Sequence, residues 1–160
     1  MNEPLVFLMG RFPARIPTDR QYATNHMWAK DQGDGWRFGF TAYAVRLMQE
    51  VYFLDWLVDE GMPVQARQEI GAIESKKAEA ALYAPLTGRV TRLNDDVLAD
   101  PSLINQDSYG PGWLLEIQGS ADGLMPAAAY RDHLKSVWRM TQRMLKGPLD
   151  DKEPERGPRT

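Results

Sequence analysis

Short strand-compatible runs separated by turn signals fill the middle of the chain. Segments 27–30 and 36–40 flank the sequence Gln32-Gly33-Asp34-Gly35, and Asp-Gly favours a tight hairpin because both central residues can take positive φ. The segment 51–58 is mostly apolar and ends before a Glu-Gly pair, which predicts a further strand. Between these strands, residues 41–48 are expected to form a short helix of one or two turns. The pattern therefore predicts a mainly β fold.

A second hairpin is predicted around a pair of lysines. Segments 69–73 and 78–83 are strand-compatible, and the turn 85–88 closes the second strand. Adjacent residues of an extended chain point to opposite sides, so one of Lys76 and Lys77 is expected to project outward from the tip. Periodicity alone does not choose between them. A lysine held at a fixed turn can be acylated by a modifying enzyme, and without modification it is a solvated charge.

The apolar period changes near the C-terminus. Pro126 suits the first turn of a helix, and apolar residues then recur at spacings of three and four up to Leu145. This predicts an amphipathic helix that packs on the β body and stops at Lys146-Gly147-Pro148. Cations recur at every fourth position along one side of it: Arg131, Lys135, Arg139 and Arg143. We interpret this row as a solvated face, with docking of an acidic partner as the alternative.

These elements divide the chain into four parts. Residues 1–21 form an N-terminal arm, broken up by prolines, with room for one edge strand at 6–9. Residues 22–119 form the β domain, and residues 120–147 contain the helix packed on it. Residues 148–160 are charged and nearly without apolar side chains, so we expect them to be disordered.

Composition excludes several kinds of chemistry. With 160 residues and 43% hydrophobic content, the chain can build one compact core. The net charge of −3 gives no basic excess that would favour nucleic acid. The absence of cysteine excludes disulfides and thiolate ligands, so any thiol chemistry would have to arrive on a cofactor. His26 and His133 are far apart in the sequence and lack companions, which argues against a metal site.

No catalytic residue and no membrane segment are expected. The spacing of serine, histidine and aspartate supports no nucleophilic triad. The apolar run 5–9 is short, follows Glu3 and lacks a small-residue cleavage site, so it does not resemble a signal peptide. Since no long apolar stretch occurs elsewhere, we expect a cytoplasmic protein without a membrane partner.

The residues around the lysine pair resemble the lipoyl-attachment motif. In Ile73-Glu74-Ser75-Lys76-Lys77-Ala78, Lys77 directly precedes Ala78 and takes the position of the modified lysine. Turn and core positions shared by lipoyl and biotinyl domains are matched by Gly61, Val64, Pro85, Gly88 and Val90. No Met-Lys-Met biotinyl motif is present.

The segment 94–113 narrows the resemblance to the H protein of the glycine cleavage system. The similar positions there are Asn94, Leu98, Pro101, Leu103, Asn105, Tyr109, Gly110, Gly112 and Trp113. Lipoyl domains of the pyruvate dehydrogenase type and biotin carriers lack this insertion. The similarity extends over about 22–118 and includes His26 and Trp28.

The resemblance implies a fold and a function. The fold would be a lipoyl/biotinyl-type barrel-sandwich hybrid, a flattened β-sandwich, with the amphipathic helix added. The protein would be a non-catalytic carrier with lipoate covalently attached to Lys77. Glu74 would serve recognition by the lipoylating enzyme, or would be a surface strand residue. The partners implied are glycine decarboxylase, which loads an aminomethyl group, aminomethyltransferase, which receives it, and dihydrolipoyl dehydrogenase, which reoxidises the arm.

Two departures from the family pattern indicate an H-like paralogue. Met27 stands where H proteins usually have glutamate, and Met48-Gln49-Glu50 replaces a turn that contains glycine. The extended arm and the long basic helix are further additions. One alternative is therefore a lipoate-binding protein that carries sulfur in a heterodisulfide-reductase-like oxidation system. Another is an unmodified scaffold module that keeps the fold.

Overall fold

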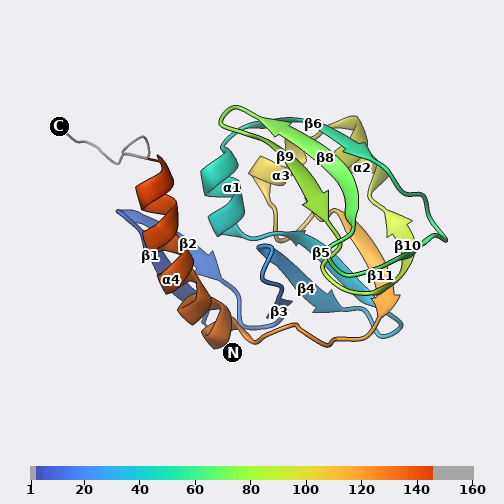
Figure 1. Ribbon diagram of the computed structural model, residues 1–160, viewed down its shortest axis with the longest axis horizontal. Coiled ribbons are helices and arrows are strands. Elements are labelled where there is room, and N and C mark those ends of the chain that lie inside the picture. The colour runs from blue at the N-terminus through green and yellow to red at the C-terminus, as the bar shows by residue number, and fades with distance from the viewer. Residues whose placement is uncertain (1–2, 146–160) are drawn as a thin grey trace.

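The computed structural model describes residues 3–145, with the backbone alone described for 143–145 (Figure 1). Its strands are β1 (Leu5–Met9), β2 (Phe12–Ile16), β3 (Gln21–Tyr22), β4 (Met27–Asp31), β5 (Trp36–Phe40), β6 (Val51–Trp56), β7 (Pro63–Val64), β8 (Glu69–Ser75), β9 (Glu79–Tyr83), β10 (Gly88–Leu93) and β11 (Leu115–Gly119). Its helices are α1 (Ala42–Met48), α2 (Asp95–Ala99), α3 (Leu103–Gln106) and α4 (Ala127–Leu145).

Two sheets enclose the main core. One sheet has the strand order β3-β4-β5-β11-β10-β7, and the other has the order β6-β8-β9. Phe38 and Ile117 of the larger sheet and Ile70 and Ile73 of the smaller sheet are buried in one cluster between them. The predicted hairpins β4-β5 and β8-β9 and the short helix α1 are all present. The structure confirms the predicted flattened β-sandwich with a C-terminal helix (Figure 1).

Glycine is required at two of the predicted turn positions for different reasons. Gly61 has φ of 93°, a left-handed conformation that side chains with a Cβ rarely adopt. Gly88, expected at the end of a turn, is instead the first residue of β10 and pairs with Gly119 of β11. A Cβ on Gly88 would overlap the carbonyl oxygen of Gln118. Gly88 therefore allows the close approach of two strands.

The N-terminal segment forms a hairpin that supports α4. Strands β1 and β2 pair antiparallel, with Leu8 opposite Pro13 and with Gly10 at φ of 62° in the turn. The sequence predicted one edge strand here. Two form because each strand of a two-stranded sheet has a free edge, where a proline without an N–H is tolerated. Figure 1 shows this hairpin and α4 packed together beside α1.

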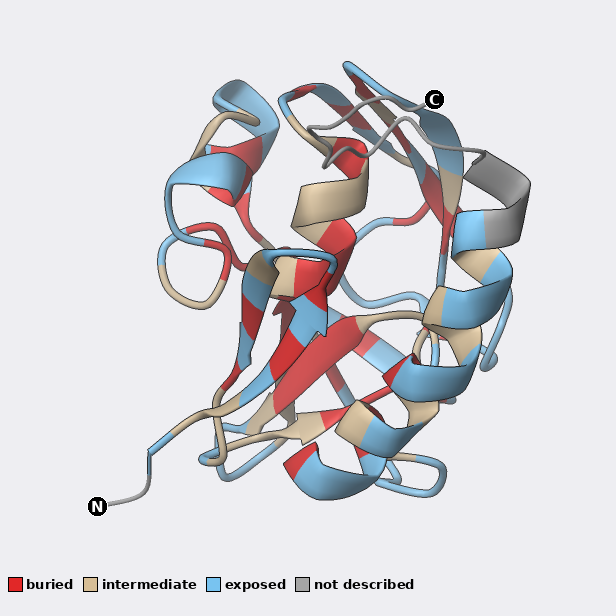
Figure 2. Ribbon diagram, turned by 90° about the vertical axis from the view of Figure 1, so that its left-hand side faces the viewer, coloured by how far each residue is buried: buried red, intermediate tan, exposed pale blue. Residues whose placement is uncertain are grey.

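Helix α4 packs largely on this hairpin and on aromatic residues next to it. Its buried and partly buried side, visible as red and tan bands in Figure 2, includes Tyr130, Leu134 and Trp138. The Trp138 ring meets Phe7 and Tyr43 edge-on, at centroid distances of 6.5 and 6.1 Å. The sequence predicted packing on the β body, and the hairpin supplies much of that surface.

On the other side of α4, Lys135 and Arg139 are exposed and Arg131 is half-buried. The side chain of Arg143 and the tail 148–160 lie outside the described residues, so the proposed division of the chain into four parts stays a prediction. Between residues 3 and 145, no helix is long and apolar enough to cross a membrane.

His26 lies in a buried polar cluster under α4. Its Nδ1 is 3.0 Å from the Tyr130 hydroxyl, which is 2.9 Å from the Thr41 hydroxyl. Burial lowers the pKa of His26 from 6.5 to about 4, with a smaller contribution from the nearby His133. The neutral ring is therefore the form that the folded protein favours.

We expect the protein to lose stability in mild acid because of His26. Below pH 6.5 the unfolded chain binds a proton that the folded chain refuses until about pH 4, so the free energy of unfolding falls as the pH falls through this window. The expected loss is about 3 kcal/mol. Urea titrations between pH 7 and pH 4 measure it. His26→Asn is the control, because asparagine tolerates the φ of 70° found there and does not titrate. An equally steep pH dependence in His26→Asn would contradict this assignment.

Candidate functional site: a lysine hairpin tip

Lys76 and Lys77 form the tip of the β8-β9 hairpin. Glu74 pairs with Glu79 at the end of the ladder, and the turn Ser75-Lys76-Lys77-Ala78 follows. The backbone N–H of Ser75 donates to the carbonyl of Ala78 at 2.8 Å, and the N–H of Ala78 donates to the Ser75 hydroxyl at 3.2 Å. Ser75 is buried, whereas both lysines are exposed. The turn is therefore closed from inside and presents two ammonium groups outside.

The tip rests on the segment 48–51, which connects α1 to β6. The backbone N–H of Lys76 donates to the carbonyl of Glu50 at 2.7 Å, and that of Lys77 donates to the carbonyl of Met48 at 3.2 Å. Hairpin tips are usually the mobile end of a ladder, but here both turn residues are tied to a second element. The root of either lysine is thus held while its side chain remains free to extend.

Asn105 of α3 supports this segment. Its side-chain Nδ2 donates to the carbonyl of Gln49 at 2.7 Å, and its Oδ1 accepts from the N–H of Val51 at 2.8 Å. The two bonds bracket Glu50, which accepts from Lys76. Gln49 has φ of 61° and ψ of −140°, a conformation suited to glycine. The amide of Asn105 therefore holds a turn in which Gln49 takes a backbone conformation suited to glycine.

The sequence indicated this support only indirectly. Asn105 was named for its resemblance to H proteins, and 48–50 was noted only because a glycine was missing. Asn105 is 56 residues from Gln49, so no local pattern joins them. The missing glycine was the available signal, since a strained turn must be held by contacts from elsewhere.

We expect Gln49→Gly to stabilise the protein by about 1 kcal/mol, because glycine adopts this conformation without strain. The midpoint of thermal unfolding should rise by about 2 to 4 °C. Gln65→Gly is the control. Gln65 does not have positive φ, so glycine there adds only freedom to the unfolded chain and should lower the midpoint. A lower midpoint for Gln49→Gly would show that the turn is unstrained.

Glu74 lies beside the tip and is half-buried. Its strand partners are Glu79 of β9 on one side and Phe53 of β6 on the other. Among the described residues, no ion pair involves Glu74, Lys76 or Lys77. The acidic pair and the lysines therefore remain available to an enzyme that approaches the tip. A lysine amide fits here because the Lys77 side chain is exposed and its backbone is held.

The two histidines are close in space, although they are far apart in the sequence. The rings of His26 and His133 have centroids 5.9 Å apart, because α4 packs on β1 and β3, near the turn that precedes β4 and carries His26. Within the described part of the chain, no group of three or more histidine, aspartate or glutamate side chains is arranged to hold a metal ion.

The two-sheet sandwich with an exposed lysine pair at a hairpin tip has the fold of the lipoyl and biotinyl type. The family model described as Glycine cleavage H-protein matches residues 20–137. The chain belongs to the glycine cleavage H-protein family. Strands β1 and β2 lie outside the matched region.

Relatives from distant organisms agree with this assignment. The chain is 42% identical over 119 residues to the glycine cleavage system H protein of Myxococcus xanthus, covering 72% of this chain and 92% of that protein. It is 36% identical over 124 residues to the probable glycine cleavage system H protein of Haloarcula marismortui, covering 75% and 97%. The crystal structure of a glycine cleavage system H protein from Mycobacterium marinum superposes with a TM-score of 0.67, at 32% identity, covering 76% of this chain and 98% of that one.

Proposed function

We propose that this protein is a non-catalytic lipoyl carrier of the glycine cleavage type, with lipoate attached through an amide to Lys77. The observation that carries the proposal is the exposed lysine tip tied by its backbone to the segment 48–51, in a chain of the H-protein family. Lys77 is favoured over Lys76 because it directly precedes Ala78, as in the attachment motif. Glu74, half-buried one strand position from the turn, would contribute to recognition by the lipoylating enzyme.

The attached lipoyl group, and not a side chain of the protein, would supply the reactive chemistry. When bound, lipoate would supply a dithiolane whose disulfide opens as one sulfur takes the transferred group and the other becomes a thiol; removal of the group would leave the dithiol. The protein holds the root of the arm through Met48, Glu50 and Asn105, and the tether raises the local concentration of the reactive sulfur at each partner. In the proposed role, glycine decarboxylase loads an aminomethyl group, aminomethyltransferase removes it, and dihydrolipoyl dehydrogenase restores the disulfide.

Turnover by dihydrolipoyl dehydrogenase tests whether the chain is a carrier. Protein from a lipoate-supplied host should gain one lipoyl group in intact mass and should support oxidation of NADH by the dehydrogenase. The same chain produced without lipoylation should support none, since it has no cysteine that could take part. If active lipoylating enzyme adds no mass, the protein is an unmodified scaffold and the proposal fails.

A further inference from the structure

A row of charged side chains crosses the outer face of the six-stranded sheet. The strand registers place Lys30 of β4 opposite Arg37 of β5, Arg37 opposite Glu116 of β11, and Glu116 opposite Arg92 of β10. Residues directly opposite one another lie on the same face of a sheet. Since neighbouring strands are about 4.8 Å apart, the row is about 15 Å long. We call Lys30, Arg37 and Arg92, together with the adjacent Arg20, the cationic row.

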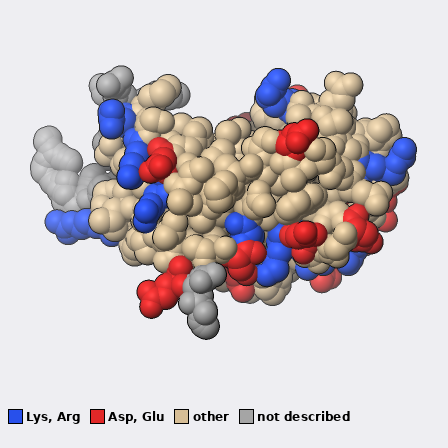
Figure 3. Space-filling view, turned by 90° about the horizontal axis from the view of Figure 1, so that it is seen from below, with Lys and Arg blue, Asp and Glu red and all other residues tan. Residues whose placement is uncertain are grey.

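The cationic row has too few acids to neutralise it. Asp19 pairs with Arg20 at 2.8 Å and with Lys30 at 2.9 Å. Glu116 pairs with Arg37 at 2.7 Å and with Arg92 at 3.7 Å. Four cations therefore share two carboxylates, in a chain whose net charge is −3. Figure 3 shows the molecule from below, with acidic and basic side chains interspersed over that face.

The placement of Lys30 opposite Arg37 lowers stability, because like charges directly opposite each other repel. Arg37 and Arg92 are two strands apart, and only Glu116 of β11 lies between them. Asp19 and Glu116 offset part of this repulsion and leave two positive charges in excess. An anionic ligand that neutralised this excess positive charge would explain why the cations are gathered here.

Aromatic rings hold the guanidinium groups in place. Arg37 and Arg92 lie over the Trp113 ring, with centroid distances of 4.2 and 5.1 Å. Arg20 lies 4.7 Å from the centroid of Trp28 and 5.4 Å from that of Tyr109. Stacking fixes the plane of each guanidinium, so little further entropy is lost when it forms a bidentate bond to a carboxylate.

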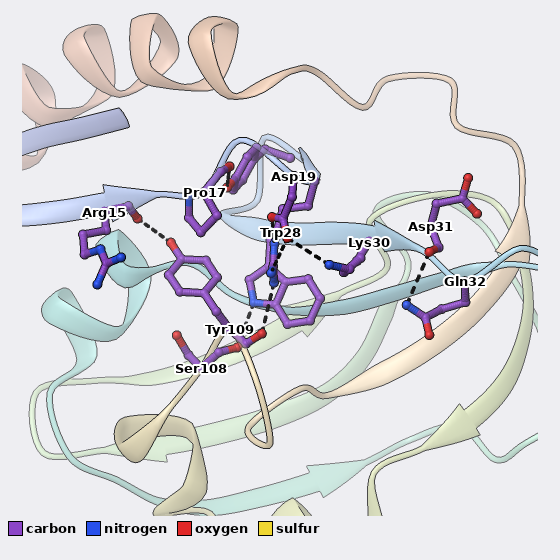
Figure 4. A network of polar contacts seen from close by, with 11 residues as sticks. Arg15, Pro17, Asp19, Trp28, Lys30, Asp31, Gln32, Ser108 and Tyr109 are labelled. Carbon is purple, nitrogen blue, oxygen red and sulfur yellow. Dashed lines mark hydrogen bonds and ion pairs between the residues drawn. The ribbon is translucent and has the colours of Figure 1, made fainter. Parts of the chain in front are cut away.

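A pocket of about 390 Å³ lies along this part of the row. Its lining consists of Arg20, Trp28, Lys30, Gln32, Arg37, Tyr109, Gly110, Pro111 and Trp113, which include three cations and no acid. Figure 4 shows Trp28 and Tyr109 side by side next to the Asp19–Lys30 pair. The Trp28 indole N–H donates to the Ser108 carbonyl at 2.8 Å, and this bond holds the Trp28 ring in its place in the pocket lining.

We propose that the cationic row is a docking surface for an acidic, extended segment of a partner protein, whose carboxylates pair with Lys30, Arg37 and Arg92. The length of the row favours a peptide over a compact anion, because about 15 Å corresponds to four or five residues of extended chain. The partly buried Tyr109 provides apolar surface for the backbone between the carboxylates. The row belongs to the larger sheet, whereas the Lys77 tip belongs to the smaller one.

Fluorescence polarisation with a labelled peptide of alternating glutamate and alanine tests the proposal on the unlipoylated chain, so the outcome is independent of the carrier function. The double variant Lys30→Gln/Arg92→Gln should weaken binding at least about tenfold. Lys135→Gln/Arg139→Gln on α4 removes the same charge from exposed positions and should change binding little. Added salt should weaken the wild-type complex, as expected for exposed charges.

Unfolding midpoints of both double variants serve as the check on folding. Arg92→Gln alone, at a side chain that is 58% exposed, gives a weaker but measurable loss if the double variant does not fold. Equal losses in the two double variants would overturn the proposal, because net charge alone would then explain binding. Absence of peptide binding at low salt would overturn it too. Competition by free glutamate or inorganic phosphate at the concentration of the peptide would show a small-anion site instead.

Discussion

Lys77→Arg is expected to abolish lipoylation completely, whereas Lys76→Arg should retain it. Arginine keeps the charge and the backbone bond to Met48 but has no amine that can form the amide. Lys76 is a closely matched control. It is adjacent to Lys77 and exposed, and its backbone N–H donates to the Glu50 carbonyl as that of Lys77 donates to the Met48 carbonyl. Intact mass of each variant from a lipoate-supplied host gives the result directly.

Peptide mapping of the wild-type protein completes this test. The modified residue should be Lys77 alone. A lipoyl group on Lys76, or an unchanged mass gain in Lys77→Arg, would mean that the position before Ala78 does not select the lysine. The carrier function would survive that result, but the site assignment would not.

Trp28→Ala should destabilise the protein by about 4 kcal/mol, the largest loss that we expect for any single side chain. Trp28 is 1% exposed and is the largest of the fully buried side chains. Its ring covers Gly39 so closely that no Cβ would fit there, and its N–H is satisfied by Ser108. Truncation therefore leaves a cavity and an unpaired carbonyl in the core cluster that Trp28 shares with the β1-β2 hairpin and α4.

Urea denaturation measures this loss, with Trp36→Ala as the matched control. Trp36 is equally large but only half-buried at the start of β5, so its removal should cost less than half as much. Similar losses for the two variants, or a loss below about 1 kcal/mol for Trp28→Ala, would contradict the packing described for Trp28.

The elements that follow local patterns could be predicted from the sequence. The β4-β5 and β8-β9 hairpins follow from strand runs around turn residues, and α4 follows from its apolar period. The β1-β2 hairpin was underestimated because its prolines suggested irregular chain. Its strands are stabilised by α4, more than one hundred residues away, and local sequence does not contain such a contact.

The same limit applies to the site. The sequence placed the lysine pair at a tip, but it could not show what holds that tip. The segment 48–51 accepts hydrogen bonds from the tip, and Asn105 holds that segment, so the support comes from positions far apart in the chain. The cationic row was also invisible, because Lys30, Arg37 and Arg92 become neighbours only through the registers of three strand pairs.

Glycine–bicarbonate exchange with glycine decarboxylase is the measurement that tests the proposed function most directly. The lipoylated protein should support exchange at a rate near that of a reference H protein, and the unlipoylated form should support none. Met27, where H proteins usually have glutamate, is buried in the main core at 1% exposure, so its substitution leaves the exposed tip available to the decarboxylase. Turnover by dihydrolipoyl dehydrogenase without any exchange would contradict the glycine cleavage role and would favour the sulfur carrier.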